Sequence, residues 1–177
     1  ENIYVLDSPI LTNSQFKKFK KFFSKKVKVI DCTFDIERSL KERIELIREE
    51  AETAVREGST CLILSDKNIS NQKASIPSIL TVGAIHSHLV KHGLRGYCSL
   101  NVECSDAMDT HSFAILIGVG ATTVNPYLAI DSIYQRFEKK LFGKSDFETC
   151  VNKFKKSIDA GLLKIMSKMG ISVISSY

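Results

Sequence analysis

The sequence predicts an α/β domain whose parallel sheet is covered by helices on both faces. Two observations lead to this fold class. Short apolar runs alternate along the chain with longer segments in which apolar residues recur every three or four positions, an alternation that is typical of successive βα units. The short runs are almost continuously apolar, as "CLIL" at 61–64 illustrates, so both faces of the sheet are expected to be buried.

The first predicted element is an amphipathic helix around the lysine-rich stretch 17–28. Phe16, Phe19 and Phe23 recur at helical spacing, which predicts that the phenylalanines point inward and the lysines point into water. The stretch holds seven lysines, and without them the net charge of +5 would be −2. Because the positive charge is confined to this one region, no nucleic-acid-binding surface is expected.

Four strands follow, separated by helices whose ends carry recognisable signals. The expected strands are 27–31, 61–65, 97–103 and 122–124. Helical patterns cover 36–54, 77–92 and 107–120 between them, and two more helices are expected at 127–140 and 147–160. Asp35 suits the N-cap of the first of these helices and Gly58 suits its C-terminal stop, whereas Pro77 suits the first turn of the next helix.

A polar residue stands at the carboxyl end of each predicted strand. These residues are Asp31, Asp66, Glu103 and Asn125. Ligands of parallel α/β folds bind at this edge of the sheet, so the four are candidate ligand-binding residues. The simpler interpretation is that they begin the loops after the strands and cap the helices that follow.

The histidines and cysteines do not form a recognisable catalytic or metal-binding motif. His88 and His92 are four residues apart on one predicted helix, a spacing that zinc sites use. No third ligand is evident from the spacing, and His111 is not attached to this pair. No nucleophile, base and oxyanion donor occur together, so neither a metal site nor a catalytic residue is predicted.

Composition and cysteine usage indicate a protein of the cytoplasm. The five cysteines include no CxxC pair, and their odd number and scattered spacing favour free thiols in a reducing compartment. No run of about 18 apolar residues is present, so no membrane-spanning segment is expected. The first residues also lack the pattern of a signal peptide.

Several phrases resemble, in the same order, the large subunit of glutamate synthase. They are "SPILTNSQF", "CLILSDKN", "IPSILTVGAIHSHLVKHGLR", "FAILIGVGATTVNPYLAI" and "GLLKIMSKMGIS". The likeness covers essentially the whole chain. It implies that residues 1–160 are the C-terminal part of the central domain, a partial and degenerate TIM-barrel-like domain, and that residues 161–177 begin the FMN-binding domain.

The resemblance implies an enzyme that makes L-glutamate from L-glutamine and 2-oxoglutarate. In such enzymes an amidotransferase domain releases ammonia, which passes through a tunnel to the FMN domain. An iron–sulfur cluster relays electrons from a pyridine-nucleotide subunit or from ferredoxin. The present chain would be a structural linker between the two catalytic domains, and it would help to line the ammonia passage. By itself it would be inactive and would hold no cofactor.

The last residues resemble the first strand of the FMN-binding barrel. In "MSKMGIS", Ser167, Lys168 and Met169 would lie nearest to the flavin. Because the neighbouring strands of that barrel are not part of this sequence, residues 162–177 are expected to lack a settled position or to pair with another copy. The alternative to the whole assignment is a free-standing α/β protein that binds a small ligand at the acidic strand ends.

Overall fold

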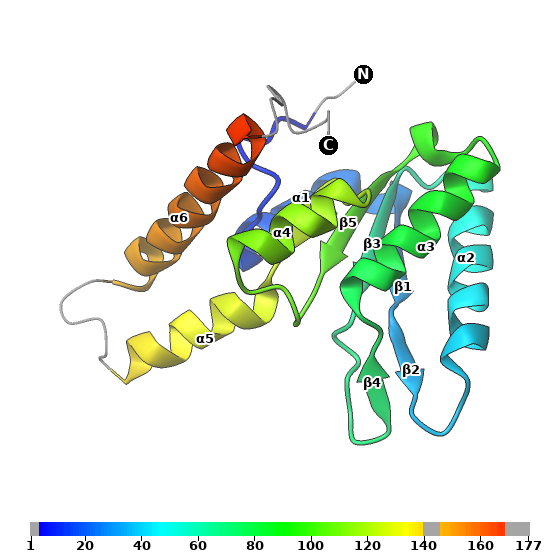
Figure 1. The fold of residues 1–177 in the computed structure, drawn as a ribbon, viewed down its shortest axis with the longest axis horizontal. Helices are drawn as coiled ribbons and strands as arrows, with labels where there is room; N and C mark the ends of the chain where they lie inside the picture. Colours follow the sequence, from blue (N-terminus) through cyan, green and yellow to red (C-terminus); the bar gives the residue numbers. More distant parts are fainter. Residues whose placement is uncertain (1–3, 140–145, 169–177) are drawn as a thin grey trace.

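The computed structural model describes residues 4–139 and 146–168, and a parallel sheet lies at its centre (Figure 1). The strands of this sheet are β1 (Val27–Asp31), β3 (Cys61–Ser65), β5 (Ser99–Glu103) and β6 (Thr123–Asn125). They lie in the order β1-β3-β5-β6, and every neighbouring pair is parallel. The predicted fold of parallel βα units is therefore confirmed, and the strands follow chain order across the sheet as they do in a barrel.

Helices cover both faces of this sheet, as predicted. They are α1 (Asn13–Phe23), α2 (Leu40–Arg56), α3 (Ser78–Lys91), α4 (Thr110–Gly118), α5 (Tyr127–Glu138) and α6 (Phe147–Lys168). Helices α2, α3 and α4 contribute to the larger core on one face, whereas α1 packs on the other face. Within the described residues, none of these helices has the length and apolarity needed to cross a bilayer.

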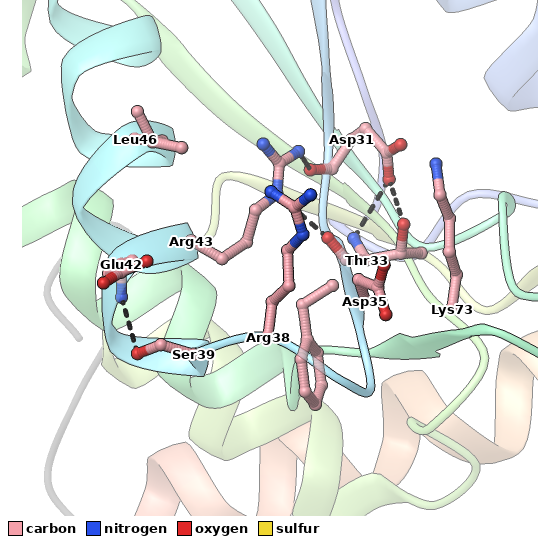
Figure 2. A pocket seen from close by; sticks show the side chains of 10 residues that line it. Asp31, Thr33, Asp35, Arg38, Ser39, Glu42, Arg43, Leu46 and Lys73 are labelled. Carbon is pink, nitrogen blue, oxygen red and sulfur yellow. Dashed lines mark hydrogen bonds between the residues drawn. The ribbon is translucent and has the colours of Figure 1, made fainter.

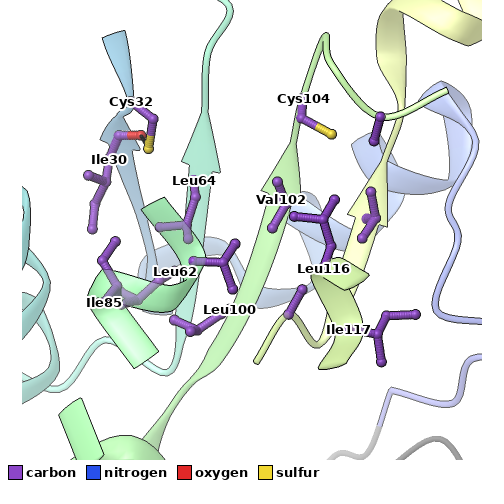
Figure 3. Close-up of a cluster of buried hydrophobic side chains, with 14 of the residues drawn as sticks. Ile30, Cys32, Leu62, Leu64, Ile85, Leu100, Val102, Cys104, Leu116 and Ile117 are labelled. Atoms are coloured by element: carbon purple, nitrogen blue, oxygen red, sulfur yellow. Dashed lines mark hydrogen bonds between the residues drawn. The ribbon is translucent and has the colours of Figure 1, made fainter. Parts of the chain in front are cut away.

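The alternating side chains of β3 show how one strand serves both layers. Leu62 and Leu64 point into the larger core, where Ile85 of α3 also lies (Figure 3). Cys61 and Ile63 belong to a second buried cluster together with the phenylalanines of α1. Because neighbouring residues of a strand point to opposite faces, a continuously apolar strand requires a covering layer on each side.

The segment before α1 extends the sheet by one more parallel position. Ile10 pairs with Val124 of β6. The Leu11 N–H donates to the Val124 carbonyl oxygen (2.9 Å), and the Val124 N–H donates to the carbonyl oxygen of Pro9 (2.8 Å). The chain then continues through α1 to β1 at the opposite edge of the sheet. This path places α1 across the second face.

The structure contains a two-stranded antiparallel ribbon that the sequence pattern does not predict. β2 (Thr33–Asp35) pairs with β4 (Lys73–Ser75) beyond the ends of β1 and β3 (Figure 1). The expected helix start at Asp35 is consequently wrong, because Asp35 ends β2 and α2 begins at Leu40 behind the N-cap Ser39. Strands of three residues are too short to show a periodic pattern, and their pairing joins segments that are far apart in the sequence.

Two other element boundaries differ slightly from the prediction. β5 begins at Ser99 rather than at 97, because Arg95–Tyr97 form a 3-10 turn. Helix α4 begins at Thr110 rather than at 107, because the side chain of Asp109 caps it by accepting a hydrogen bond from the Ser112 N–H (2.8 Å). In both places a local turn or cap decides the boundary, while the kind of element is as predicted.

Helix α6 is longer than predicted and corrects the interpretation of the last described residues. The expected helix ends at 160 and a strand follows, whereas α6 continues to Lys168. Ile158 and Leu162 are 5% and 3% exposed and belong to the larger core, so the apolar stripe of the helix continues past the expected end. Residues 162–168 are therefore helical and do not start a strand, and residues 169–177 lie outside the described part of the chain.

Candidate functional site

The four polar residues at the strand ends lie at one edge of the sheet, as the sequence predicts. In the parallel register Asp31 is level with Ser65 of the next strand. Ser65 is level with Glu103, and Glu103 is level with Asn125. Asp66 follows Ser65 directly in the chain. We call Asp31, Asp66, Glu103 and Asn125 the strand-end edge.

Asp66 is a buried carboxylate that holds three separate segments together. It is 2% exposed, and its Oδ2 accepts hydrogen bonds from the Ser75 hydroxyl (3.0 Å) and from the N–H and hydroxyl of Ser105 (2.9 and 2.7 Å). Its Oδ1 accepts a hydrogen bond from the Tyr127 hydroxyl (2.7 Å). Burial and this contact with Asp66 raise the pKa of Tyr127, so its hydroxyl remains a donor. Four donors occupy the acceptor positions of the carboxylate.

Glu103 is a buried carboxylate that is bound by two lysines. It is 4% exposed, and its Oε1 accepts a hydrogen bond from the Ser65 hydroxyl (2.7 Å). The Nζ atoms of Lys20 and Lys67 lie 3.6 and 3.4 Å from Oε2. Lys20 belongs to α1, so the expectation that the lysines of this helix point only into water is wrong at this position. A buried carboxylate is costly unless hydrogen bonds or a positive group compensate for the lost water, and Glu103 has both.

The two outer members of the strand-end edge are also bonded within the protein. Asp31 accepts hydrogen bonds from the N–H and hydroxyl of Thr33 (3.0 and 2.7 Å) and from the Asn68 amide (3.0 Å). Burial opposes the ionisation of Asp31, but these hydrogen bonds outweigh it and lower its pKa. Asn125 donates from Nδ2 to the carbonyl oxygen of Leu11 (3.0 Å). These are the contacts of residues that begin loops and join segments, in line with the simpler interpretation of the sequence.

A groove of about 370 Å³ opens between β1, the β2–β4 ribbon and the first turns of α2 (Figure 2). Its charged lining residues are Asp31, Asp35, Glu42, Arg38, Arg43 and Lys73. Arg43 is held against the ribbon, because its Nη2 donates to the Asp31 carbonyl oxygen (2.6 Å) and its Nε donates to the Thr33 carbonyl oxygen (3.0 Å). The sequence does not predict this groove, since the groove depends on the ribbon.

The residues expected nearest to a flavin lie at the end of α6. Ser167 and Lys168 are the last two residues of this helix, and the Ser167 side chain is exposed. Met169 lies outside the described residues. Ser167 and Lys168 therefore lie in a helix, whereas a strand was expected there. A position near the flavin remains a prediction for all three.

Comparison with known proteins finds one family and a set of relatives that match nearly the whole chain. A family model described as the glutamate synthase central domain matches residues 1–177. Over 97% of its length, the chain is 48% identical to a glutamate synthase [NADPH] large chain of Azospirillum brasilense and 42% identical to that of Bacillus subtilis. It is 38% identical to a ferredoxin-dependent glutamate synthase of Pyropia yezoensis, again over 97% of this chain. The chain spans 11–12% of the length of these relatives.

Two solved structures share the fold at low sequence identity. A DHODH from Eimeria tenella matches with a TM-score of 0.55 and 15% identity, over 85% of this chain and 36% of that chain. A flavocytochrome b2 variant matches with a TM-score of 0.56 and 17% identity, over 78% of this chain and 37% of that chain. Both are TIM-barrel-type proteins, so the parallel sheet corresponds to part of a barrel, as predicted.

Replacement of Asp66 tests how much the strand-end edge contributes to stability. We expect Asp66→Asn to lower the free energy of unfolding by about 1–3 kcal/mol, because the amide N–H₂ would face donors that now bind a carboxylate oxygen. Glu45→Gln is the control at an exposed residue of α2, and it should change this free energy by about 0.5 kcal/mol or less. Urea unfolding measures both variants. An Asp66→Asn chain as stable as the control would show that these hydrogen bonds contribute little.

The lowered pKa of Asp31 predicts a loss of stability in acid. A carboxyl group whose pKa is lower in the folded state than its ordinary value of 3.8 stabilises the fold fully above that value. The contribution disappears as the pH falls through the folded-state pKa, so the stability difference between the unmodified chain and Asp31→Asn should shrink below 3.8. Carboxyl NMR should give Asp31 a midpoint below 3.8, and Thr33→Val should raise it. A midpoint at or above 3.8 would be the contrary result.

Proposed function

The chain belongs to the glutamate synthase central-domain family, and on this basis we propose that it is a segment of a glutamate synthase. Such an enzyme makes L-glutamate from L-glutamine and 2-oxoglutarate, so the whole protein would be an oxidoreductase of ammonia assimilation. Identities of 38–48% to proteins named glutamate synthase support this proposal. Because the chain spans 12% of the length of the first of these relatives, the catalytic domains are expected elsewhere in the whole protein.

Within that enzyme we assign to the segment a structural role between the amidotransferase and FMN domains. The observation that carries this assignment is the bonding of the strand-end edge. Barrel enzymes place their reacting groups at this edge, but here Asp66 already binds Tyr127 and two serines, and Glu103 already binds lysine. These contacts support a segment that holds its neighbours in place and is not catalytic by itself.

FMN and the iron–sulfur cluster are proposed to bind other parts of the whole protein. A flavin phosphate needs backbone N–H donors at a helix N-terminus or positive side chains, whereas the strand-end edge presents the carboxylates of Asp31, Asp66 and Glu103. The described residues at this edge therefore do not fit FMN, and we propose neither flavin nor an iron–sulfur cluster for the segment. Electrons would come from a pyridine-nucleotide subunit or from ferredoxin, since relatives of both kinds match the chain.

The domain boundary and the cellular location follow the same proposal. Residues 1–160 would form the C-terminal part of the central domain, and residues 161–177 would lead into the FMN-binding domain. Helix α6 passes through residue 160 without a break, so this connection would begin as a helix.

The five cysteines are free thiols, which supports a reducing compartment, and we propose the cytoplasm. No nucleic acid or membrane is proposed as a partner.

A free-standing ligand-binding domain is the second candidate function. The groove beside Asp31 favours it, because charged residues of both signs line a hollow of about 370 Å³ that a small polar ligand could occupy. One of these residues, Arg43, donates to backbone carbonyl oxygens of the protein. The match of residues 1–177 to the central-domain family supports the first candidate over this one.

The proposed place beside the ammonia passage is testable in the full-length enzyme. We expect Glu103→Gln to lower glutamine-dependent glutamate formation more than ammonia-dependent glutamate formation, because the loss of the carboxylate loosens the Lys20 contact of α1 at this edge. Parallel assays with the two nitrogen donors measure the ratio. Glu45→Gln, at an exposed residue of α2, is the control and should leave the ratio unchanged. Equal losses in both assays would contradict the passage role but not the family assignment.

The isolated 177-residue chain is expected neither to catalyse the reaction nor to bind FMN tightly. Most contacts of a flavin would lie in other domains, and each 1.4 kcal/mol of lost interaction weakens binding tenfold, so we expect a Kd of about 1 mM or weaker. Titration of FMN with flavin fluorescence as the readout measures this. Saturable micromolar binding that Lys168→Met weakens would place the flavin site in this chain after all.

A further inference from the structure

Away from the strand-end edge, the described residues contain a cluster of side chains that can bind metal ions. Glu52 of α2 lies against His88 of α3 and against His92, the C-cap residue that directly follows α3. Its Oε1 is 2.9 Å from the Nε2 of His88 and 3.5 Å from the Nε2 of His92. One ligand atom from each of the three residues lies within 4.8 Å of the other two.

The cluster arises from a helical spacing combined with a contact between two helices. His88 and the C-cap residue His92 are four residues apart, so they lie on the same side of the C-terminal end of α3, and their ring centroids are 4.4 Å apart. Helix α2 packs beside α3 (Figure 1) and brings Glu52 to that face. The expectation that this histidine pair lacks a third ligand is therefore incomplete. The third donor belongs to another helix, 36 residues before His88, and spacing alone does not reveal it.

The donor atoms match a zinc site in their dimensions and in their chemistry. Zinc bonds of about 2.0–2.1 Å in a tetrahedral arrangement place neighbouring ligand atoms about 3.3 Å apart. The separations of 2.9 and 3.5 Å from the Glu52 Oε1 lie on either side of this value, and the two histidine nitrogens lie within 4.8 Å of each other. Two imidazole nitrogens and one carboxylate oxygen suit zinc and related ions, whereas magnesium and calcium prefer oxygen ligands.

We propose that Glu52, His88 and His92 form a binding site for a divalent transition-metal ion of the zinc class, with water as the fourth ligand. Their side chains are 27%, 20% and 35% exposed, so the site is reached from solvent and has room for that water. A bound ion would join α2 to α3 on the outer surface of the partial barrel. In its absence the Nε2–H of His88 can donate to the same carboxylate oxygen. With an ion bound at Nε2, the neutral imidazole would carry its proton on Nδ1.

The charges around the cluster prepare one carboxylate oxygen for the metal ion. The Nε of Arg56 lies 3.3 Å from the Oε2 of Glu52, so Arg56 holds that oxygen and leaves Oε1 facing the histidines. An outer contact of this kind orients a metal ligand.

Zinc titration of the 177-residue chain by isothermal titration calorimetry tests the site directly. In a buffer that does not chelate metals we expect one ion per chain. Glu52→Gln and His92→Gln should each bind at least about tenfold more weakly, since even a lost outer contact weakens metal affinity about 10–100-fold. His111→Gln, at an exposed residue of α4, is the matched control and should bind like the unmodified chain. Circular dichroism of His92→Gln, a change at a partly exposed side chain, verifies that the variant folds.

Cobalt spectra distinguish this site from binding by the cysteines. Tetrahedral Co²⁺ with nitrogen and oxygen ligands gives visible bands, whereas thiolate ligands add an intense near-ultraviolet band. We expect the visible bands without the thiolate band, and we expect His92→Gln to abolish them. Three results would each overturn the proposal: a thiolate band, the absence of saturable zinc binding, or equal zinc affinity in the unmodified chain and Glu52→Gln.

Discussion

The parallel sheet of this chain has to be covered on both faces, because its strands carry apolar side chains on each side. Helices α2, α3 and α4 cover one face through a continuous core. In a complete barrel the other face would meet the remaining strands, but here it receives α1 and the segment before it. Phe16 and Phe19 of this helix are 1% and 3% exposed. One helix thus takes the place of the missing part of the barrel and allows a partial barrel to form a packed unit.

The covering of the second face also explains the polar contacts beneath it. Asn101 and Thr123 are 0% and 1% exposed, and a buried polar group is costly unless it is hydrogen-bonded. The Thr123 hydroxyl donates to the Asn101 Oδ1 (2.8 Å), and the Asn101 amide donates to the Leu62 carbonyl oxygen (3.1 Å). Glu103 on the same face needs a positive partner and receives Lys20 from α1. The lysine-rich helix therefore contributes apolar cover and a counter-charge together.

The strand-end edge keeps the position of a barrel enzyme's active site but uses its residues to hold segments together. Asp66 alone joins the β2–β4 ribbon, the loop after β5 and the first turn of α5. Residues whose acceptor positions are occupied by donors of the protein fix the geometry of the segments that they join. Such rigidity is in line with the proposed structural role of the segment. The cluster in which Glu52 faces two histidines lies apart from this edge, on the outer surface.

The sequence by itself determined the fold class and the order of the main helices and strands, because periodicity shows which faces are buried. It also determined that Asp31, Glu103 and Asn125 share one edge, because parallel strands end at the same edge of a sheet. The apolar stripe that extends α6 is also present in the sequence. Only the tertiary structure decided that Lys20 meets Glu103, that Glu52 meets the histidine pair, and that two three-residue strands form a ribbon. A local pattern shows that a side chain is buried or polar. The partner that covers or binds this side chain comes from a distant segment, and the packing of the whole chain decides which segment supplies it.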